Sequence, residues 1–197
     1  MTNPMGWEVK SLGSICTKLN DGTHFSPENA PIGDYKYITA KNIKADGFCF
    51  DNLTYVSADV HNGIYSRCNP EFGDVLYIKD GVTTGIAMIN TLDEPFSILS
   101  SVALLKQDRS IIEGCFLRDV LNNKDMYKYI RKMMGGAAIT RLTIEKIKKI
   151  EIPLPPLPLQ TRFAGMVQQV DKTKFALQKG LEKLELCYKA LMQRYFG

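Results

Sequence analysis

Hydrophobic residues in the first half of the chain come in short runs separated by turn-forming residues. The runs have the length of strands and are rich in aromatic and β-branched side chains, and they cover residues 35–39, 48–50, 53–56, 75–79, 86–89 and 102–105. Turn-forming pairs lie between them, at Asp46-Gly47, Asn62-Gly63 and Asp80-Gly81. This pattern predicts a twisted sheet, mixed or antiparallel, with long loops. Six aromatic residues alternate along these runs and are expected in its core: Tyr35, Tyr37, Phe48, Phe50, Tyr55 and Tyr77.

A helical pattern follows the sheet region. From Phe116 to Met133, apolar residues recur at steps of three and four, which is typical of a helix with one buried face. Gly135-Gly136 predicts the end of this helix, and Thr143 is expected to cap a short helix that runs through Ile150. The expected fold class is therefore α+β, with helices packed on a mixed or antiparallel sheet.

Residues 152–160, IPLPPLPLQ, hold four prolines within six positions. Proline fixes the backbone and cannot lie inside a helix, so this stretch predicts a stiff, extended joint. Pro158 suits the first turn of a following helix, where its missing N–H has no cost. We therefore expect a globular domain over residues 1–151, a proline-rich joint over 152–158 and a long helix over 159–197.

The last segment has the spacing of a coiled coil. Its apolar residues are alternately four and three positions apart, and only Lys174 interrupts them. At ~1.5 Å per residue the helix is about 55 Å long, and the sequence predicts no second helix to cover the seam. The seam therefore predicts a partner, most simply a second copy of the chain. The expected dimerisation residues are Phe163, Val167, Val170, Leu177, Leu181, Leu184, Tyr188, Leu191 and Tyr195.

Charge is unevenly distributed along the 197 residues, although the formal net charge is only +4. Residues 1–123 hold 10 Lys and Arg against 15 Asp and Glu, whereas residues 124–149 hold 8 against 2. A concentrated basic segment is typical of contacts with nucleic-acid phosphates, and a solvated helix face is the alternative. Lys146, Lys148 and Lys149 fit either interpretation.

Known catalytic motifs are missing from the sequence. Asn69-Pro70 is followed by Glu71-Phe72 instead of the second proline and aromatic residue of an adenine-methyltransferase box, and residues 81–85 lack the Lys-Ser/Thr of a phosphate-binding loop. No GxSxG motif or spaced carboxylate set for a nuclease occurs. His24 and His61 have no Cys or His at ligand spacing, so we expect loop or surface histidines. The expectation is a non-catalytic chain with no metal and no bound cofactor.

Composition also bears on the cellular compartment. The five cysteines are odd in number and form no CxxC pair, which favours a reducing environment. No apolar run approaches the ~20 residues of a membrane span, and the first residues lack the pattern of a signal peptide. We expect a cytoplasmic protein with no membrane partner.

Several segments resemble, in order, the specificity (S) subunit of type I restriction–modification systems. They are GWEVKSLGSI, DGTHFSP, YKYITAKNI, FGDVLYIKDGVTTGIAMI and, most specific, GGAAITRLTIEKIKKIEIPLPPLPLQ followed by the long helix. A full-length subunit of this family has two target recognition domains, each followed by a long helix, and the two helices pair antiparallel. This sequence resembles one such half.

The resemblance implies a non-catalytic chain that binds double-stranded DNA. As a homodimer with an antiparallel coiled coil it reads an interrupted palindrome, because twofold protein symmetry imposes a symmetric site. Its implied partners are adenine methyltransferase (modification) subunits that use S-adenosylmethionine, and restriction or translocase subunits that use ATP and magnesium. The competing interpretations are a stand-alone dimeric DNA-binding regulator, although no helix-turn-helix is evident, and a small nuclease or methyltransferase.

Base reading is then expected from the loops of the sheet and from the loop 135–141, because Lys and Arg suit guanine and Asn and Gln suit adenine. The candidates are Lys18, Asn20, Thr23, His24, Lys41, Asn42, Lys79, Asp80, Thr83, Thr84, Thr140 and Arg141. Alternatively, Asp80 starts an ordinary turn, as does Asp21, and Thr83 and Thr84 are strand residues. Among the aromatic residues, Phe25 is the one candidate for contacting bases or for a wedge between them. We expect Lys79→Ala to weaken DNA binding without disturbing the fold.

Overall fold

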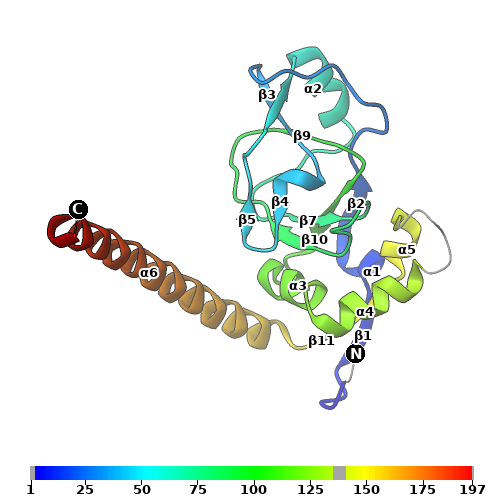
Figure 1. The fold of residues 1–197 in the computed structure, drawn as a ribbon. Helices are drawn as coiled ribbons and strands as arrows, with labels where there is room; N and C mark the ends of the chain where they lie inside the picture. The colour runs from blue at the N-terminus through cyan, green and yellow to red at the C-terminus, as the bar shows by residue number, and fades with distance from the viewer. Residues whose placement is uncertain (1–2, 135–140, 197) are drawn as a thin grey trace.

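The computed structural model describes residues 3–134 and 141–196 and has a mixed α/β body from which one long helix projects (Figure 1). The strands are β1 (Glu8–Ser11), β2 (Cys16–Asp21), β3 (Tyr35–Ile38), β4 (Ile43–Lys44), β5 (Gly47–Phe48), β6 (Thr54–Val56), β7 (Val75–Ile78), β8 (Ala87–Ile89), β9 (Ser97–Ile98), β10 (Val102–Gln107) and β11 (Glu151–Leu154). The helices are α1 (Leu12–Ile15), α2 (Ala58–Tyr65), α3 (Gly114–Leu121), α4 (Lys124–Met133), α5 (Ile144–Lys148) and α6 (Leu157–Phe196), with a 3₁₀ turn at Ala40–Asn42. The expected α+β class is confirmed.

The central sheet has the order β2-β10-β7-β8, and all its neighbouring strands are antiparallel. All four residues of β7, VLYI, are buried. Val75 and Tyr77 belong to the core beneath α3, α4 and α5, whereas Leu76 and Ile78 belong to a second core on the other face. Because both faces are covered, β7 is a continuous apolar run and not an alternating one.

A smaller sheet, β6-β3-β9, and the β4–β5 hairpin lie over the second core. The pair β3–β9 is parallel, so the sheets are mixed as expected. The predicted turn at Asp46-Gly47 joins β4 to β5. The predicted turn at Asn62-Gly63 is wrong, because both residues lie within α2, which Ser57 caps. Of the expected core aromatics, Tyr37 and Tyr77 are buried, but Phe50 is 46% exposed, which corrects that prediction.

The helix expected from Phe116 to Met133 is in fact two helices, α3 and α4. The helix is interrupted at Asn123, because the side chain of Asn123 accepts a hydrogen bond from the N–H of Asp125 and so caps α4. Asn122 pairs with the backbone of Ala87 on β8, donating to its carbonyl oxygen and accepting from its N–H, both at 2.8 Å. Thr143 caps α5 as predicted. The predicted stop at Gly135-Gly136 lies outside the described residues.

The proline-rich stretch is extended, as predicted, but it begins as a strand of the body. β11 pairs antiparallel with β1, with Leu154 opposite Glu8 and Glu151 opposite Ser11. Helix α6 begins at Leu157, two residues earlier than expected, and Pro158 lies in its first turn. The pairing holds the joint to the body, so the root of α6 is fixed by a sheet edge.

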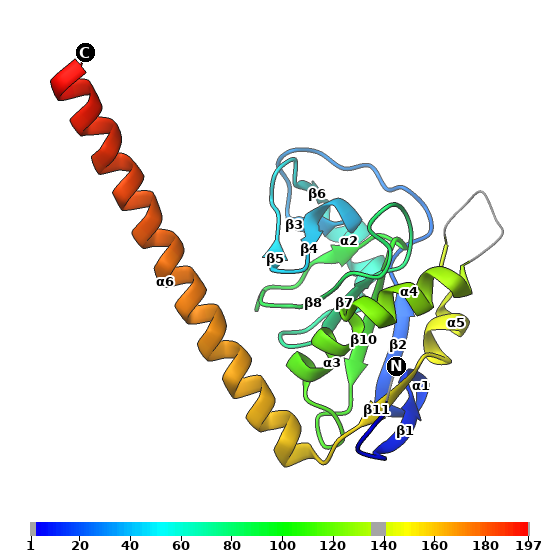
Figure 2. The same ribbon diagram turned by 60° about the horizontal axis from the view of Figure 1, so that its bottom comes forward.

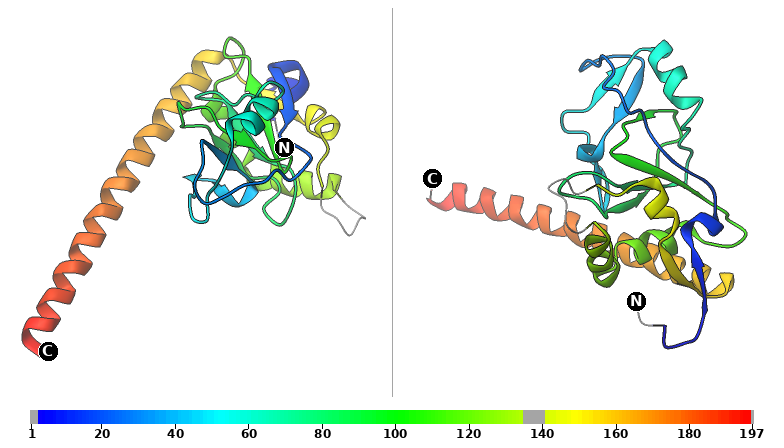
Figure 3. Two further views of the ribbon diagram at one scale, coloured as in Figure 1. Left: turned by 90° about the horizontal axis from the view of Figure 1, so that it is seen from above. Right: turned by 90° about the vertical axis from the view of Figure 1, so that its right-hand side faces the viewer.

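Helix α6 runs away from the body along most of its 40 residues (Figures 1 and 2). Only Gln160 and Ala164 are buried, both in its first turns. Phe163 packs edge-on against Phe116 of α3, with ring centroids 6.0 Å apart. Figure 3 shows the far end of α6 clear of the body in both views. None of the described helices combines the length and apolarity needed to cross a membrane.

Candidate nucleic-acid interface

Buried charges gather where β2 and β7 end. Both strands run antiparallel to β10, which lies between them, so their last residues meet at the same edge of the sheet. Asp21 ends β2, and Lys79 and Asp80 follow β7. The Lys79 ammonium lies 3.3 Å from an oxygen of Asp21 and 3.2 Å from an oxygen of Asp80. Lys79 is only 2% exposed, and such a buried charge is tolerated because it is paired on both sides.

Three half-exposed basic side chains surround the buried carboxylate of Asp21 and the half-buried carboxylate of Asp80. His24 Nε2 lies 3.2 Å from Asp21, and Arg67 Nη2 lies 3.7 Å from the same carboxylate. Arg67 also donates to the backbone carbonyls of Asp21 and Gly22. On the other side, Arg141 Nε donates to both oxygens of Asp80, at 3.0 and 3.2 Å. The three side chains are 56%, 52% and 52% exposed, so this edge offers hydrogen-bond donors to an anionic ligand.

The chain before α5 is held at this edge by its backbone as well. Asp80 and Arg141 form an isolated antiparallel bridge, and the N–H of Leu142 donates to the carbonyl of Lys79 at 2.8 Å. The predicted recognition loop 135–141 therefore ends at the ion-pair network. Its candidate Thr140 lies outside the described residues.

The loop after Asp80 is a tight turn, not a strand. Gly81 has φ of 94°, a conformation that favours glycine, so Asp80-Gly81 does form a turn. Thr84 is fully buried and its hydroxyl donates to the carbonyl of Gly81, while Thr83 is half-buried. The interpretation of both threonines as strand residues is wrong. Arg131 of α4 donates to the carbonyl of Val82 and fixes the turn against the helix.

The remaining described candidates are not part of this ion-pair network. On β2, Lys18 Nζ donates to Asn69 and the Asn20 amide donates to the carbonyl of Arg67. Thr23 is buried beside His24. Lys41 is exposed on the 3₁₀ turn, whereas the buried Asn42 is used to hold that turn together, accepting from Thr39.

The structure adds Arg67 to the site, a residue that the sequence pattern did not single out. Its contacts to Asp21 and Gly22 span 45 or 46 residues, and no local motif marks it. With Thr23, His24, Phe25, Gly63 and Ile64 it lines a hollow of about 200 Å³. Phe25 is 61% exposed at this hollow, so it can contact a ligand there.

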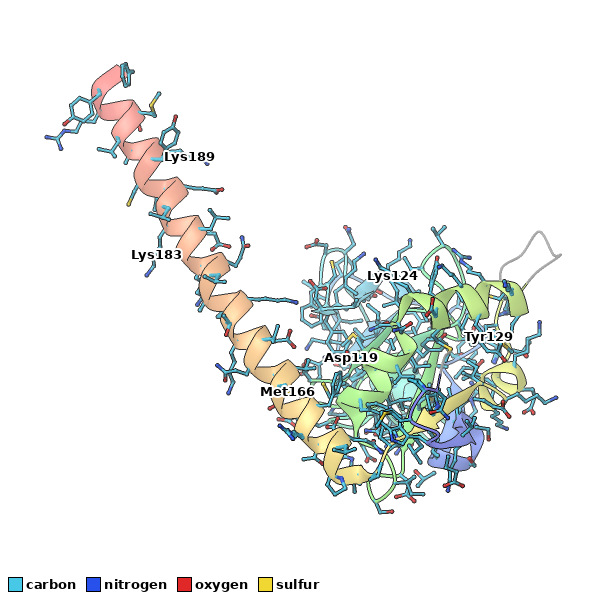
Figure 4. All side chains as sticks on the ribbon, turned by 90° about the horizontal axis from the view of Figure 1, so that it is seen from below. Asp119, Lys124, Tyr129, Met166, Lys183 and Lys189 are labelled. Carbon is cyan, nitrogen blue, oxygen red and sulfur yellow. The ribbon has the colours of Figure 1, made fainter. Side chains whose placement is uncertain are left out.

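The basic segment falls on α4 and α5. On α4, Lys124, Lys128 and Lys132 are exposed, and Figure 4 shows Lys124 and Tyr129 along this helix. On α5, Lys148 pairs with Glu145 at 2.9 Å and Lys146 donates to the carbonyl of Met133. Lys128 lies 4.0 Å from Asp125 of its own helix, whereas Lys124 and Lys132 of α4 and Lys149 after α5 form no ion pair with a described residue and are the freest for contacts with phosphates.

A long apolar stripe remains uncovered along α6. From Val170 to Tyr195 the apolar seam residues are between 50% and 69% exposed, whereas Phe163 and Val167 are half-buried near the body. A groove of about 1150 Å³ separates the first half of α6 from α3 and the β4–β5 hairpin. Figure 4 shows Met166 of α6 beside Asp119 of α3, and both line this groove. An apolar stripe of this length is typical of a protein–protein interface.

Other reactive groups do not form a site among the described residues. No three His, Cys, Asp or Glu side chains in the described part of the chain are placed to share a metal ion. Burial raises the pKa of Cys16 and of Cys68 to about 12 and that of Cys115 to about 11, so these thiols stay protonated at neutral pH. His61 is not the loop or surface histidine expected, because it lies in α2 and is 3% exposed.

Comparison with known proteins identifies the family. Residues 4–186 match the model of the type I restriction modification DNA specificity domain, and the chain belongs to that family. Two relatives are specificity subunits of type I restriction enzymes of Methanocaldococcus jannaschii. MjaVIII is 27% identical over 178 residues, 84% of this chain and 40% of the relative, and MjaIX is 24% identical over 206 residues, 97% and 44%. The chain thus spans less than half the length of these curated relatives.

Solved structures show the same fold. A chain from a structural study of complex assembly and conformational transition in the type I R-M system gives a TM-score of 0.67 at 21% identity, over 98% of this chain and 45% of that one. The HsdS subunit from Thermoanaerobacter tengcongensis gives a TM-score of 0.62 at 20% identity, over 91% and 41%. The S subunit from M. genitalium gives 0.59 at 19%, over 99% and 46%.

Proposed function

We propose that this chain is a non-catalytic DNA specificity component of a type I restriction–modification system, binding one half of a bipartite target. The observation that carries the proposal is the family match over residues 4–186, which includes both the body and most of α6. The edge where β2 and β7 end supports it, because exposed Arg and His donors suit base edges and phosphates there. The basic face of α4 suits the DNA backbone.

The uncovered seam supports a homodimer. In an antiparallel pair of identical helices, a positions face d positions of the partner. If the twofold axis passes at residue 179, Phe163 faces Tyr195, Leu177 faces Leu181, and the layers between follow the same rule, with Lys174 opposite Leu184. This full overlap also brings the last turns of the partner helix toward the groove beside α3. Two bodies held at opposite ends of such a coiled coil read an interrupted palindrome.

The chain acts through its partners in this proposal. Adenine methyltransferase subunits that use S-adenosylmethionine bind the dimer and modify each half-site, and restriction or translocase subunits supply ATP- and magnesium-dependent cleavage. The chain itself provides sequence recognition and spacing.

The test is a genome-wide map of N6-methyladenine with the gene intact, deleted and restored. We expect an interrupted palindrome to lose methylation on deletion and to regain it on restoration. An asymmetric bipartite motif would reject the homodimer in favour of pairing with a different half. If the map is unchanged while a methyltransferase encoded beside the gene is expressed, the specificity role is rejected and a stand-alone DNA-binding regulator becomes the better account.

A further inference from the structure

Within the described part of the chain, Arg141 is anchored through one of its nitrogens. Its Nε donates to both carboxylate oxygens of Asp80, at 3.0 and 3.2 Å. No hydrogen bond joins its two terminal nitrogens to any residue in the described part of the chain, and the side chain is 52% exposed. The anchored side chain therefore presents the outer fork of its guanidinium to the solvent.

Asp80 is itself held in place by the buried ammonium of Lys79. The Lys79 ammonium lies 3.2 Å from it and 3.3 Å from Asp21, and Lys79 is 2% exposed. The backbone bridge between Asp80 and Arg141 adds a second constraint on the same pair. An arginine held in this way loses little side-chain entropy when it binds, so its geometry is prepared for a ligand.

The geometry of the fork selects among ligands. Guanine offers two adjacent acceptors, O6 and N7, on its major-groove edge, whereas adenine offers one acceptor and one donor. A fork of two N–H donors matches the two acceptors of guanine, whereas on adenine one of the donors would face the amino group, which is also a donor.

We propose that Arg141 reads a guanine in the half-site through its terminal nitrogens, that Asp80 positions it, and that Lys79 fixes Asp80 without touching DNA. This inference rests on the proposed function and assigns roles within that site. It divides three residues that the sequence grouped together as DNA contacts into one base reader and two positioning residues.

Methylation maps of single-residue variants test the proposal. Arg141→Lys keeps the charge but removes the fork, and Asp80→Asn keeps the shape but removes the negative charge and one of the two acceptors that anchor Arg141. Both are expected to relax the motif at one G·C position in each half-site, with a ~10- to 100-fold loss of discrimination there, and to leave the other positions unchanged. Because Asp80 acts through Arg141, the double variant is expected to lose no more discrimination at this position than Arg141→Lys alone.

Arg109→Lys is the matched control. Arg109 is an exposed arginine whose Nη2 donates to the carbonyl of Phe72, and it follows the far end of β10. Its variant is expected to keep the motif and the methylated fraction. The thermal unfolding midpoints of all purified variants report whether each one folds.

Three results overturn the inference while leaving the proposed function in place. They are a wild-type motif without guanine, an unchanged motif in the folded Arg141→Lys variant, and a uniform fall in methylation with no relaxed position, which indicates a phosphate contact. Loss of the proposed function has a different signature, since deleting the whole gene then leaves the map unchanged.

Discussion

The Gln160 side chain joins the first turn of α6 to the segment before α3, because its Oε1 accepts a hydrogen bond from the N–H of Glu113 at 2.9 Å. Its Nε2 donates to the carbonyls of Ile111 and Pro155, at 3.2 and 2.8 Å. Gln160 is 1% exposed, so these bonds form away from water. One buried amide thus fixes the direction in which a 40-residue helix leaves the body.

Replacing this amide by an apolar group is expected to weaken the root of α6. In Gln160→Leu the N–H of Glu113 and two carbonyls lose their buried partner, which costs about 1 to 3 kcal/mol of unfolding free energy. Urea unfolding followed by circular dichroism measures the difference. Gln169→Leu, at an exposed position of the same helix, is the control and is expected to change little. Equal stability of the two variants would contradict the role assigned to Gln160.

A charge in the α6 seam is expected to break the dimer. In Leu181→Asp the carboxylate faces Leu177 of the partner helix without a counter-ion, whereas in Leu184→Asp it faces Lys174, so Leu181→Asp is the variant of choice. Light scattering is expected to give the mass of one chain for Leu181→Asp and of two chains for the wild type. Leu186→Asp is the matched control, because Leu186 is 70% exposed on the opposite side of the heptad and its variant is expected to stay dimeric. A dimer that survives Leu181→Asp would rule out this seam.

Lys79→Ala is expected to destabilise the fold, in contrast to the expectation from sequence that the fold stays intact. Removing the ammonium leaves Asp21 and Asp80 close together without their shared cation, and breaking a buried ion pair costs about 3 to 5 kcal/mol. Chemical denaturation measures the loss. Lys41→Ala removes an exposed lysine and is expected to stay within about 0.5 kcal/mol of the wild type. Wild-type stability in Lys79→Ala would mean that the buried network contributes nothing.

The stability of the protein is expected to fall when the pH drops below about 6.5. His61 stacks on Tyr35 at 3.8 Å and lies 3.0 Å from the Ser97 hydroxyl, and burial lowers the pKa of His61 below its usual 6.5. The unfolded chain then binds a proton at a higher pH than the folded chain, so acid favours unfolding. Urea midpoints between pH 8 and 5 measure the slope on this acid side. His61→Phe is expected to reduce this slope. If the urea midpoints of the variant and of the wild type fall in parallel with pH, His61 is not the source of the pH dependence.

Gly22→Ala is expected to disrupt the edge that carries the candidate site. A Cβ at residue 22 lies 1.9 Å from the carbonyl oxygen of Ile98, so the backbone of one segment must move. Thermal unfolding is expected to show a large loss or no folded protein. Gly63→Ala is the matched control, because a Cβ there meets nothing within 4 Å and the residue lies in α2. That variant is expected to gain up to ~1 kcal/mol from helix propensity.

Local patterns in the sequence were sufficient for elements whose stability depends on near neighbours. The cap at Thr143, the extended proline-rich stretch and the strand at residues 75–78 follow from residue type and spacing. The exposed heptad stripe of α6 likewise follows from its period. The break between α3 and α4 did not, because Asn122 ends the helix partly by pairing with Ala87, 35 residues away.

The sequence by itself determined the α+β class, the extended stretch and the apolar seam, because each is encoded by hydrophobic period and backbone restriction over a few turns or strands. Only the tertiary structure decided how the charged candidates are used. Lys79 follows a strand like many surface lysines, but it becomes buried because β2 and β7, on either side of β10, end at the same edge of the sheet and place Asp21 and Asp80 against it. Arg67 and Arg141 reach the same edge from distant segments. Such contacts depend on strand order, which no local pattern encodes.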